Sequence, residues 1–307
     1  MAFLRAVGRF VPERVVANAE LAARLGCEPE WIREVSGIVE RRYGSESVVE
    51  MATLAAADCL AQAGVEASSI GCVIVSSGSA QRRFPGPAAE TAARLGIGGA
   101  PAIDLPVASA GSLFAMALAA DLAGRFGRVL VIASEKMSAV MEGAAPDRNT
   151  AILFGDGAGA CLVDAAEGWA RIENFKLHSD GAFADHLRLD FNQGLHMDGR
   201  TVILQAARKI PAAIREVLQA AGLAPADVSA FLMHQANQNL IVKVAQALEA
   251  PPEKFYSNIA RYGNTSSASM LIAAAEWRRE NPQAGGPVVF AAFGAGFHWG
   301  ALLALGS

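Results

Sequence analysis

Apolar residues along this chain fall into two patterns, short continuous runs and longer stretches in which they recur at helical spacing. The short runs are typical of buried strands covered on both faces, and they lie at residues 69–77, 102–108 and 128–134. The longer stretches predict helices at residues 18–26, 28–35, 47–63, 88–95 and 110–124. This alternation of strands and helices predicts an α/β fold.

Smaller details of the pattern refine this prediction. Asn18 stands where it can cap the first helix, and Gly26 and Gly64 end the first and third helices. Residues 152–165, ILFGDGAGACLVDA, predict a pair of strands bent at the glycines. A loop is predicted from the end of the 128–134 strand through Pro146.

The second half of the pattern repeats the first at an offset of 158 residues. LAQAGVEASSIGCVIVSSGSAQ at 60–81 aligns without a gap with LQAAGLAPADVSAFLMHQANQN at 218–239, and Ser109 aligns with Ser267. Chance similarity between alanine-rich helices is the alternative, but the strands and turns match as well. We therefore predict two similar α/β halves, residues 1–167 and 168–307, related by a pseudo-twofold axis.

Composition narrows the class of protein. The 307 residues are 52% hydrophobic and 18% charged, with a net charge of −4, so no nucleic acid or other polyanion is expected as a partner. Four cysteines lie scattered without CxxC pairs, which indicates reduced thiols, a cytoplasmic setting and no metal site. No apolar run reaches about 18 residues, so no membrane association is expected.

The stretch at 101–124 is the best candidate for chemistry. An apolar strand turns sharply into a helix, and Ser109 stands at the turn. A helix N-terminus offers unpaired N–H groups and a partial positive charge to a nucleophile placed there. The alternative is that Ser109 simply caps the helix, because serine is a favoured cap residue.

The duplication brings equivalent turns from the two halves together. His234 occupies in the second half the place that Ser76 has in the first, at the end of a strand. The turn containing Asn264 opens the counterpart of the Ser109 helix. Taken alone, His234 is as readily a core histidine and Asn264 a turn residue. The repeat predicts that Ser109, His234 and Asn264 share one cleft.

Four motifs carry a resemblance to a known family: HQAN at 234–237, YGNTSSAS at 262–269, FGDGAGA at 154–160 and FGAGFHWG at 293–300. Together with WIREVSGIVERR near the start, they resemble the β-ketoacyl-ACP synthase III family. The resemblance implies a thiolase fold, a duplicated five-layered αβαβα architecture, assembled as a homodimer. It also implies an acyltransferase of fatty acid or polyketide biosynthesis, which acylates itself from acyl-CoA and condenses the acyl group with malonyl-ACP. No cofactor is implied beyond acyl-CoA as substrate.

The family's active site has a cysteine, a histidine and an asparagine, and the matching positions here are Ser109, His234 and Asn264. A helix terminus lowers a pKa by at most about 1.5 units, which leaves an alcohol protonated. Ser109 therefore needs a general base, and His234 is the candidate. The resemblance places the oxyanion on the backbone N–H groups of Ser109 and Ala295, where the family has glycine at the second position.

Other matches concern partners. Trp31 matches a residue that stacks on the CoA adenine and Arg148 one of its cationic companions, while Val35 replaces the other companion, an arginine. Phe84 matches a residue that enters the neighbouring subunit's acyl pocket across the dimer interface. The basic residues that dock the carrier protein are replaced by Leu204, Asn239 and Gln246. Acyl-CoA is thus expected as a partner, and either acyl carrier protein or another acyl acceptor is possible. The acyl pocket is expected at the loops 137–143 and 191–196.

Three interpretations remain open. The chain is an acyltransferase that uses Ser109, or a cysteine enzyme whose nucleophile was changed to serine to trap a complex, or a non-catalytic subunit that pairs with an active homologue. The presence of both His234 and Asn264 weighs against the third. Residues His178, His186, His196 and His298 lack metal-ligand spacing and are interpreted as surface or structural.

Overall fold

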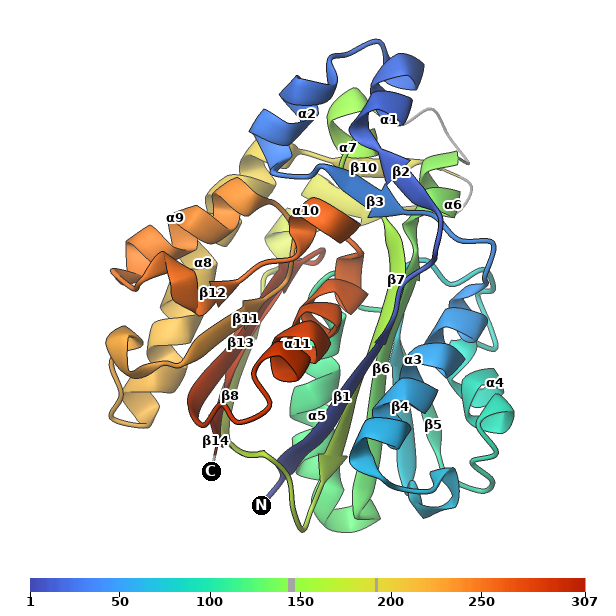
Figure 1. Cartoon of the computed structure of the whole chain (residues 1–307), viewed down its shortest axis with the longest axis vertical. Coiled ribbons are helices and arrows are strands. Elements are labelled where there is room, and N and C mark those ends of the chain that lie inside the picture. Colours follow the sequence, from blue (N-terminus) through green and yellow to red (C-terminus); the bar gives the residue numbers. More distant parts are fainter. Residues whose placement is uncertain (143–146, 191–192, 307) are drawn as a thin grey trace.

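The centre of the molecule is a ten-stranded sheet with the strand order β12-β11-β13-β14-β8-β1-β7-β6-β4-β5 (Figure 1). The computed structural model describes residues 1–142, 147–190 and 193–306. Strands of the first half are β1 (Phe3–Phe10), β4 (Cys72–Ser76), β5 (Ala102–Leu105), β6 (Arg128–Lys136) and β7 (Asp156–Asp164). Strands of the second half are β8 (Ala170–Ser179), β11 (Ala230–Met233), β12 (Phe255–Tyr256), β13 (Gly286–Gly294) and β14 (His298–Gly306). Two small hairpins pair β2 (Val15–Ala17) with β3 (Glu40–Arg42) and β9 (Leu187–Leu189) with β10 (Leu195–Met197).

Eleven α-helices pack against the sheet or lie at its ends in the described ranges. They are α1 (Asn18–Leu25), α2 (Pro29–Ser36), α3 (Val48–Ala63), α4 (Pro87–Arg94), α5 (Gly111–Phe126), α6 (Met137–Glu142), α7 (Arg148–Ala151), α8 (Gly199–Ala220), α9 (Gln238–Leu248), α10 (Ile259–Tyr262) and α11 (Ser269–Glu280). Short 3-10 turns are Ala67–Ser69, Gly181–His186, Pro225–Asp227, Pro252–Lys254 and Ser266–Ala268. Of the described helices, none is both long and apolar enough to cross a membrane.

The sheet has the same topology in both halves. The inner pair β1 and β8 is followed outward by β7, β6, β4 and β5 on one side and by β14, β13, β11 and β12 on the other. In each half the third strand pairs antiparallel with the second and parallel with the fourth. The division that we propose between residues 167 and 168 lies in the connection from β7 to β8.

Five layers result, because the two halves of the sheet enclose α5 and α11 and carry other helices on their outer faces (Figure 1). Side chains of β6 alternate accordingly: Val129 and Val131 join the central cluster with α5, whereas Leu130 and Ile132 pack with α3 and α4. Strand β13 alternates in the same way between the central cluster and the cluster formed with α8 and α9. The thiolase fold expected from the sequence is confirmed.

Three local predictions were wrong. Residues 152–165 contain a single long strand, β7, over Asp156–Asp164, preceded by an isolated bridge at Phe154, instead of two strands. Asn18 does not cap α1, because its side chain is buried and donates to the carbonyl oxygen of Ile38 at 2.7 Å. The loop predicted after β6 begins with helix α6, and residues 143–146 of it lie outside the described residues.

Candidate active site

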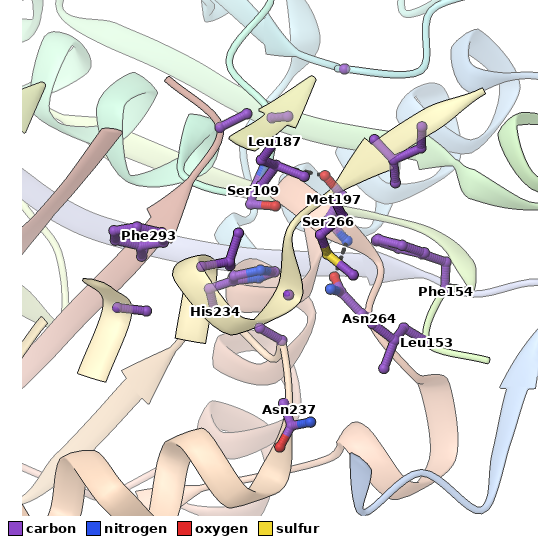
Figure 2. A pocket seen from close by; sticks show the side chains of 18 of the residues that line it. Ser109, Leu153, Phe154, Leu187, Met197, His234, Asn237, Asn264, Ser266 and Phe293 are labelled. Carbon is purple, nitrogen blue, oxygen red and sulfur yellow. Dashed lines mark hydrogen bonds between the residues drawn. The ribbon is translucent and has the colours of Figure 1, made fainter. Parts of the chain in front are cut away.

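One cavity receives side chains from both halves of the fold. It lies where the start of α5, the end of β11, the turn before α11 and the β13–β14 turn meet (Figure 2). Ser109, His234, Asn264 and Ala295 all line it, together with mostly apolar side chains. The structure therefore brings together the residues that the repeat predicted in one cleft.

Ser109 occupies an unusual turn between β5 and α5. Its φ is 60°, a left-handed conformation that is uncommon for a residue other than glycine and that recurs at functional sites. Ser109 does not act as the cap, because α5 begins at Gly111 with Ala110 as its N-cap residue. A close neighbour is Gly294 at the end of β13, where a Cβ atom would lie 2.1 Å from the carbonyl oxygen of Ala108. The absence of that Cβ lets the strand approach the turn.

The backbone N–H of Ser109 is already engaged. It donates to the Oγ atom of Ser266 at 3.1 Å. The N–H of Ala295, in the turn between β13 and β14, donates to no group in the described part of the chain. Among the described residues, the N–H of Ala295 is thus without a partner, whereas that of Ser109 is bonded to Ser266, so the pairing of these two N–H groups around an oxyanion stays a prediction.

Ser266 also fixes the amide of Asn264. The Ser266 N–H donates to Asn264 Oδ1 at 2.8 Å, and because a backbone N–H requires an oxygen acceptor, the amide orientation is settled (Figure 2). The backbone of Asn264 is held as well, by an N–H bond of 2.8 Å to the Leu153 carbonyl oxygen. Asn264 Nδ2 then remains a donor without a partner among the described residues.

His234 follows β11 and is 6% exposed. Burial lowers its pKa from 6.5 to about 4, so the ring is neutral at neutral pH. Its Nδ1 atom lies 2.6 Å from Ser269 Oγ, at the start of α11. Within the described residues, no hydrogen bond joins the ring to the hydroxyl of Ser109.

Beneath the cavity, a buried carboxylate joins the two halves. Glu135 near the end of β6 is fully buried and accepts hydrogen bonds of 2.6 Å from the hydroxyls of Ser79 and Ser267. It also accepts from the N–H of Gly78, which lines the cavity. The sequence analysis missed Glu135. It did single out Ser267, the residue that donates to Glu135, because Ser267 aligns with Ser109.

The apolar wall combines predicted and missed segments. Met137 and Leu195 come from the two loops expected to form the acyl pocket, whereas residues 143, 191 and 192 of those loops lie outside the described residues. Much of the rest comes from β9 and from one face of α8, including Val202, Ala206 and Ile210. Their spacing of four residues is visible in the sequence and could have identified this face.

The residues expected at CoA and at a partner subunit lie outside this wall. The guanidinium carbon of Arg148 in α7 lies 4.9 Å from the ring centroid of Trp31 in α2, so the two are neighbours as the resemblance implies. Phe84, in the loop before α4, is 85% exposed. Leu204 is 67% exposed on α8, and the Asn239 amide donates to the Glu34 carbonyl oxygen, which ties α9 to α2.

Comparison with known proteins agrees with this geometry. Profiles described as 3-oxoacyl-[acyl-carrier-protein (ACP)] synthase III and as its C-terminal part match residues 103–181 and 218–305. The chain is 37% identical to the β-ketoacyl-[acyl-carrier-protein] synthase III of Rhodobacter capsulatus over 319 aligned residues, covering 98% of each chain.

Solved structures give the same result. The 3-oxoacyl-[acyl-carrier-protein] synthase III of Aquifex aeolicus VF5 matches with a TM-score of 0.95 and 34% identity, over 99% of this chain and 100% of that one. The priming β-ketosynthase of the R1128 polyketide pathway matches with a TM-score of 0.91 and 31% identity, over 99% and 96%. The chain therefore belongs to the β-ketoacyl-[acyl-carrier-protein] synthase III family.

Proposed function

We propose that this protein takes an acyl group from an acyl-CoA onto residue 109 and then condenses it with, or passes it to, a second acceptor. The convergence of Ser109, His234 and Asn264 on one mostly apolar cavity carries this proposal. An apolar wall suits an acyl chain, and few polar groups suit the orientation of its carbonyl. The related proteins are named for the corresponding synthase activity.

In the first step, the Oγ atom of Ser109 attacks the thioester carbonyl carbon. A C–O bond forms, the C–S bond breaks, and the CoA sulfur receives the proton that leaves Ser109. The negative charge that develops on the carbonyl oxygen is stabilised by the N–H of Ala295, a residue that lines the cavity and whose N–H has no partner in the described part of the chain. The N–H of Ser109 contributes only if it leaves Ser266.

In the second step, a malonyl thioester loses CO₂ and its carbanion attacks the acyl carbonyl carbon. A C–C bond forms, the ester bond to Ser109 breaks, and the Ser109 oxygen takes a proton from water. Asn264 Nδ2 and the cavity-side nitrogen of His234 are the polar groups left to bind the malonyl carbonyl oxygen. A serine ester is a poorer acyl donor than a thioester, so transfer to a simpler acceptor competes with condensation.

The proposal extends to the partners. Trp31 and Arg148 bind the CoA adenine and phosphates, because a planar ring gains from stacking on indole and a guanidinium suits phosphate. Phe84 enters the neighbouring subunit of a homodimer, which explains its exposure in a single chain. The four free cysteines support a cytoplasmic setting.

Release of CoA thiol tests this function. The protein is mixed with a panel of acyl-CoAs, with and without a malonyl thioester, and free thiol is followed with a thiol-reactive chromophore. We expect stoichiometric release with a preferred acyl-CoA and no release by Ser109→Ala. Release by Ser109→Ala at the rate of the unaltered chain contradicts the assignment of residue 109.

A further inference from the structure

Among the described residues, the imidazole ring of His234 has one hydrogen-bond partner, the hydroxyl of Ser269. Ser269 is the first residue of α11 and is 2% exposed. Its Oγ atom lies 2.6 Å from His234 Nδ1 and accepts the Gln235 N–H at 3.0 Å. A neutral imidazole carries its single proton on either Nδ1 or Nε2, and the partner of one nitrogen decides the state of the other.

The hydrogen-bonding capacity of the Ser269 hydroxyl distinguishes the two tautomers. A hydroxyl has one proton and two lone pairs, and the Gln235 N–H occupies one lone pair. If His234 Nδ1 carried the proton and donated to the second lone pair, the hydroxyl proton would have no acceptor among the described residues. Burying an unpaired donor is costly. If the hydroxyl donates to Nδ1, the bonded groups are all satisfied.

We propose that Ser269 is the positioning residue that holds His234 in the tautomer with its proton on Nε2. This inference rests on the proposed function, since it concerns the same site. His234 then offers an N–H to the cavity, beside the Nδ2 donor of Asn264. Two neutral donors suit the carbonyl oxygen of a thioester substrate.

The same assignment removes His234 as a base for Ser109. An imidazole whose Nε2 carries a proton and whose Nδ1 accepts a hydrogen bond has no lone pair left for the serine proton. This differs from the role that the sequence suggests for His234. It follows that the hydroxyl at position 109 is acylated slowly. The two donors that the second step needs, the Nε2–H of His234 and the Nδ2–H of Asn264, are still present.

The tautomer can be measured in the unaltered full-length protein. Its histidines are labelled with ¹⁵N, and long-range proton–nitrogen correlation spectra distinguish Nε2–H from Nδ1–H; His234→Gln identifies the signals of His234 among the five histidines. We expect a protonated Nε2 and an unprotonated Nδ1. A protonated Nδ1 overturns the inference. The spectrum needs no turnover, so a failure of the proposed function is seen separately, as absent CoA release.

Kinetics test the role of the hydroxyl itself. We expect Ser269→Ala to lower kcat for condensation about tenfold, as the loss of one hydrogen bond in a transition state predicts, with KM for acyl-CoA changed by less than about twofold. Ser269→Thr keeps the hydroxyl and restores most of kcat. Ser112→Ala is the matched control, because its buried hydroxyl has no partner within the described ranges. Equal losses in Ser269→Ala and Ser112→Ala, or a Ser269→Ala chain with unchanged kcat, overturn the inference.

Discussion

Gly294 offers a sharp test of how tightly the two halves hold the turn that carries Ser109. A Cβ atom at this position would lie 2.1 Å from the Ala108 carbonyl oxygen, 2.8 Å from the Ala110 nitrogen and 2.9 Å from Ser109 Cβ. These atoms belong to the backbone or to its first side-chain carbon, so none can rotate away. Gly294→Ala must therefore move the end of β13 or the turn itself.

The size of the effect follows from this clash. Adding a methyl group to a packed interior costs about 1–3 kcal/mol of folding free energy. A displacement of about 1 Å at a reacting group costs on the order of 100-fold in rate. We expect Gly294→Ala to lower the free energy of unfolding by the first amount and the rate of CoA release by the second.

Gly124→Ala is the matched control. Gly124 lies within α5, the helix that begins at the same turn, and a Cβ there meets nothing within 4 Å. Alanine is favoured over glycine inside a helix by about 0.5–1 kcal/mol, so this variant gains stability. Denaturant unfolding and CoA release are measured for both variants. A Gly294→Ala chain with unaltered stability and rate would refute the close approach of β13 to Ser109.

Three further predictions concern CoA, pH and assembly. Trp31→Ala weakens acyl-CoA binding about fivefold in calorimetry, since a lost aromatic contact costs about 1 kcal/mol. Unchanged affinity would place the nucleotide elsewhere. Burial lowers the pKa of His234 to about 4 in the folded chain. Between pH 6.5 and pH 4, the unfolded chain therefore binds a proton at this histidine and the folded chain does not. The contribution of His234 to the free energy of unfolding is therefore greatest above pH 6.5 and falls toward pH 4 by up to about 3 kcal/mol. We expect His234→Gln to flatten this pH dependence in unfolding titrations. An equally steep profile for the variant excludes His234 as the cause. Phe84→Asp converts a dimer into monomers in size-exclusion chromatography with light scattering, and a monomeric unaltered protein rejects the proposed interface.

The fold could be predicted because its determinants are strong and repeated. Continuous apolar strands, glycine-ended helices and the offset of 158 residues all point to the same duplicated architecture. The meeting of Ser109, His234 and Asn264 follows from equivalent turns in the two halves, so their convergence was accessible as well. The prediction for Asn18 failed because its side chain donates to the carbonyl oxygen of Ile38, a tertiary contact, instead of capping the helix.

The finer site could not be predicted, because it depends on the direction of small side chains. Serines are common in turns, and nothing in GNTSSAS shows that Ser266 bonds to Ser109, Ser267 to Glu135 and Ser269 to His234. These partners are separated along the chain by 157, 132 and 35 residues. Only the folded backbone brings them within hydrogen-bonding distance.

The central claim is that residue 109 receives the acyl group. Intact-mass and peptide mass spectrometry after incubation with an acyl-CoA test it directly, on the unaltered chain and on Ser109→Cys. We predict acyl mass on the peptide that contains residue 109 in both, appearing faster with cysteine because a thiol at a helix N-terminus ionises and an alcohol does not. Faster acylation and condensation with cysteine also favour the interpretation of Ser109 as a replaced cysteine, whereas no gain favours a natural serine. Acyl mass on neither protein would contradict the claim and leave the partner-subunit interpretation.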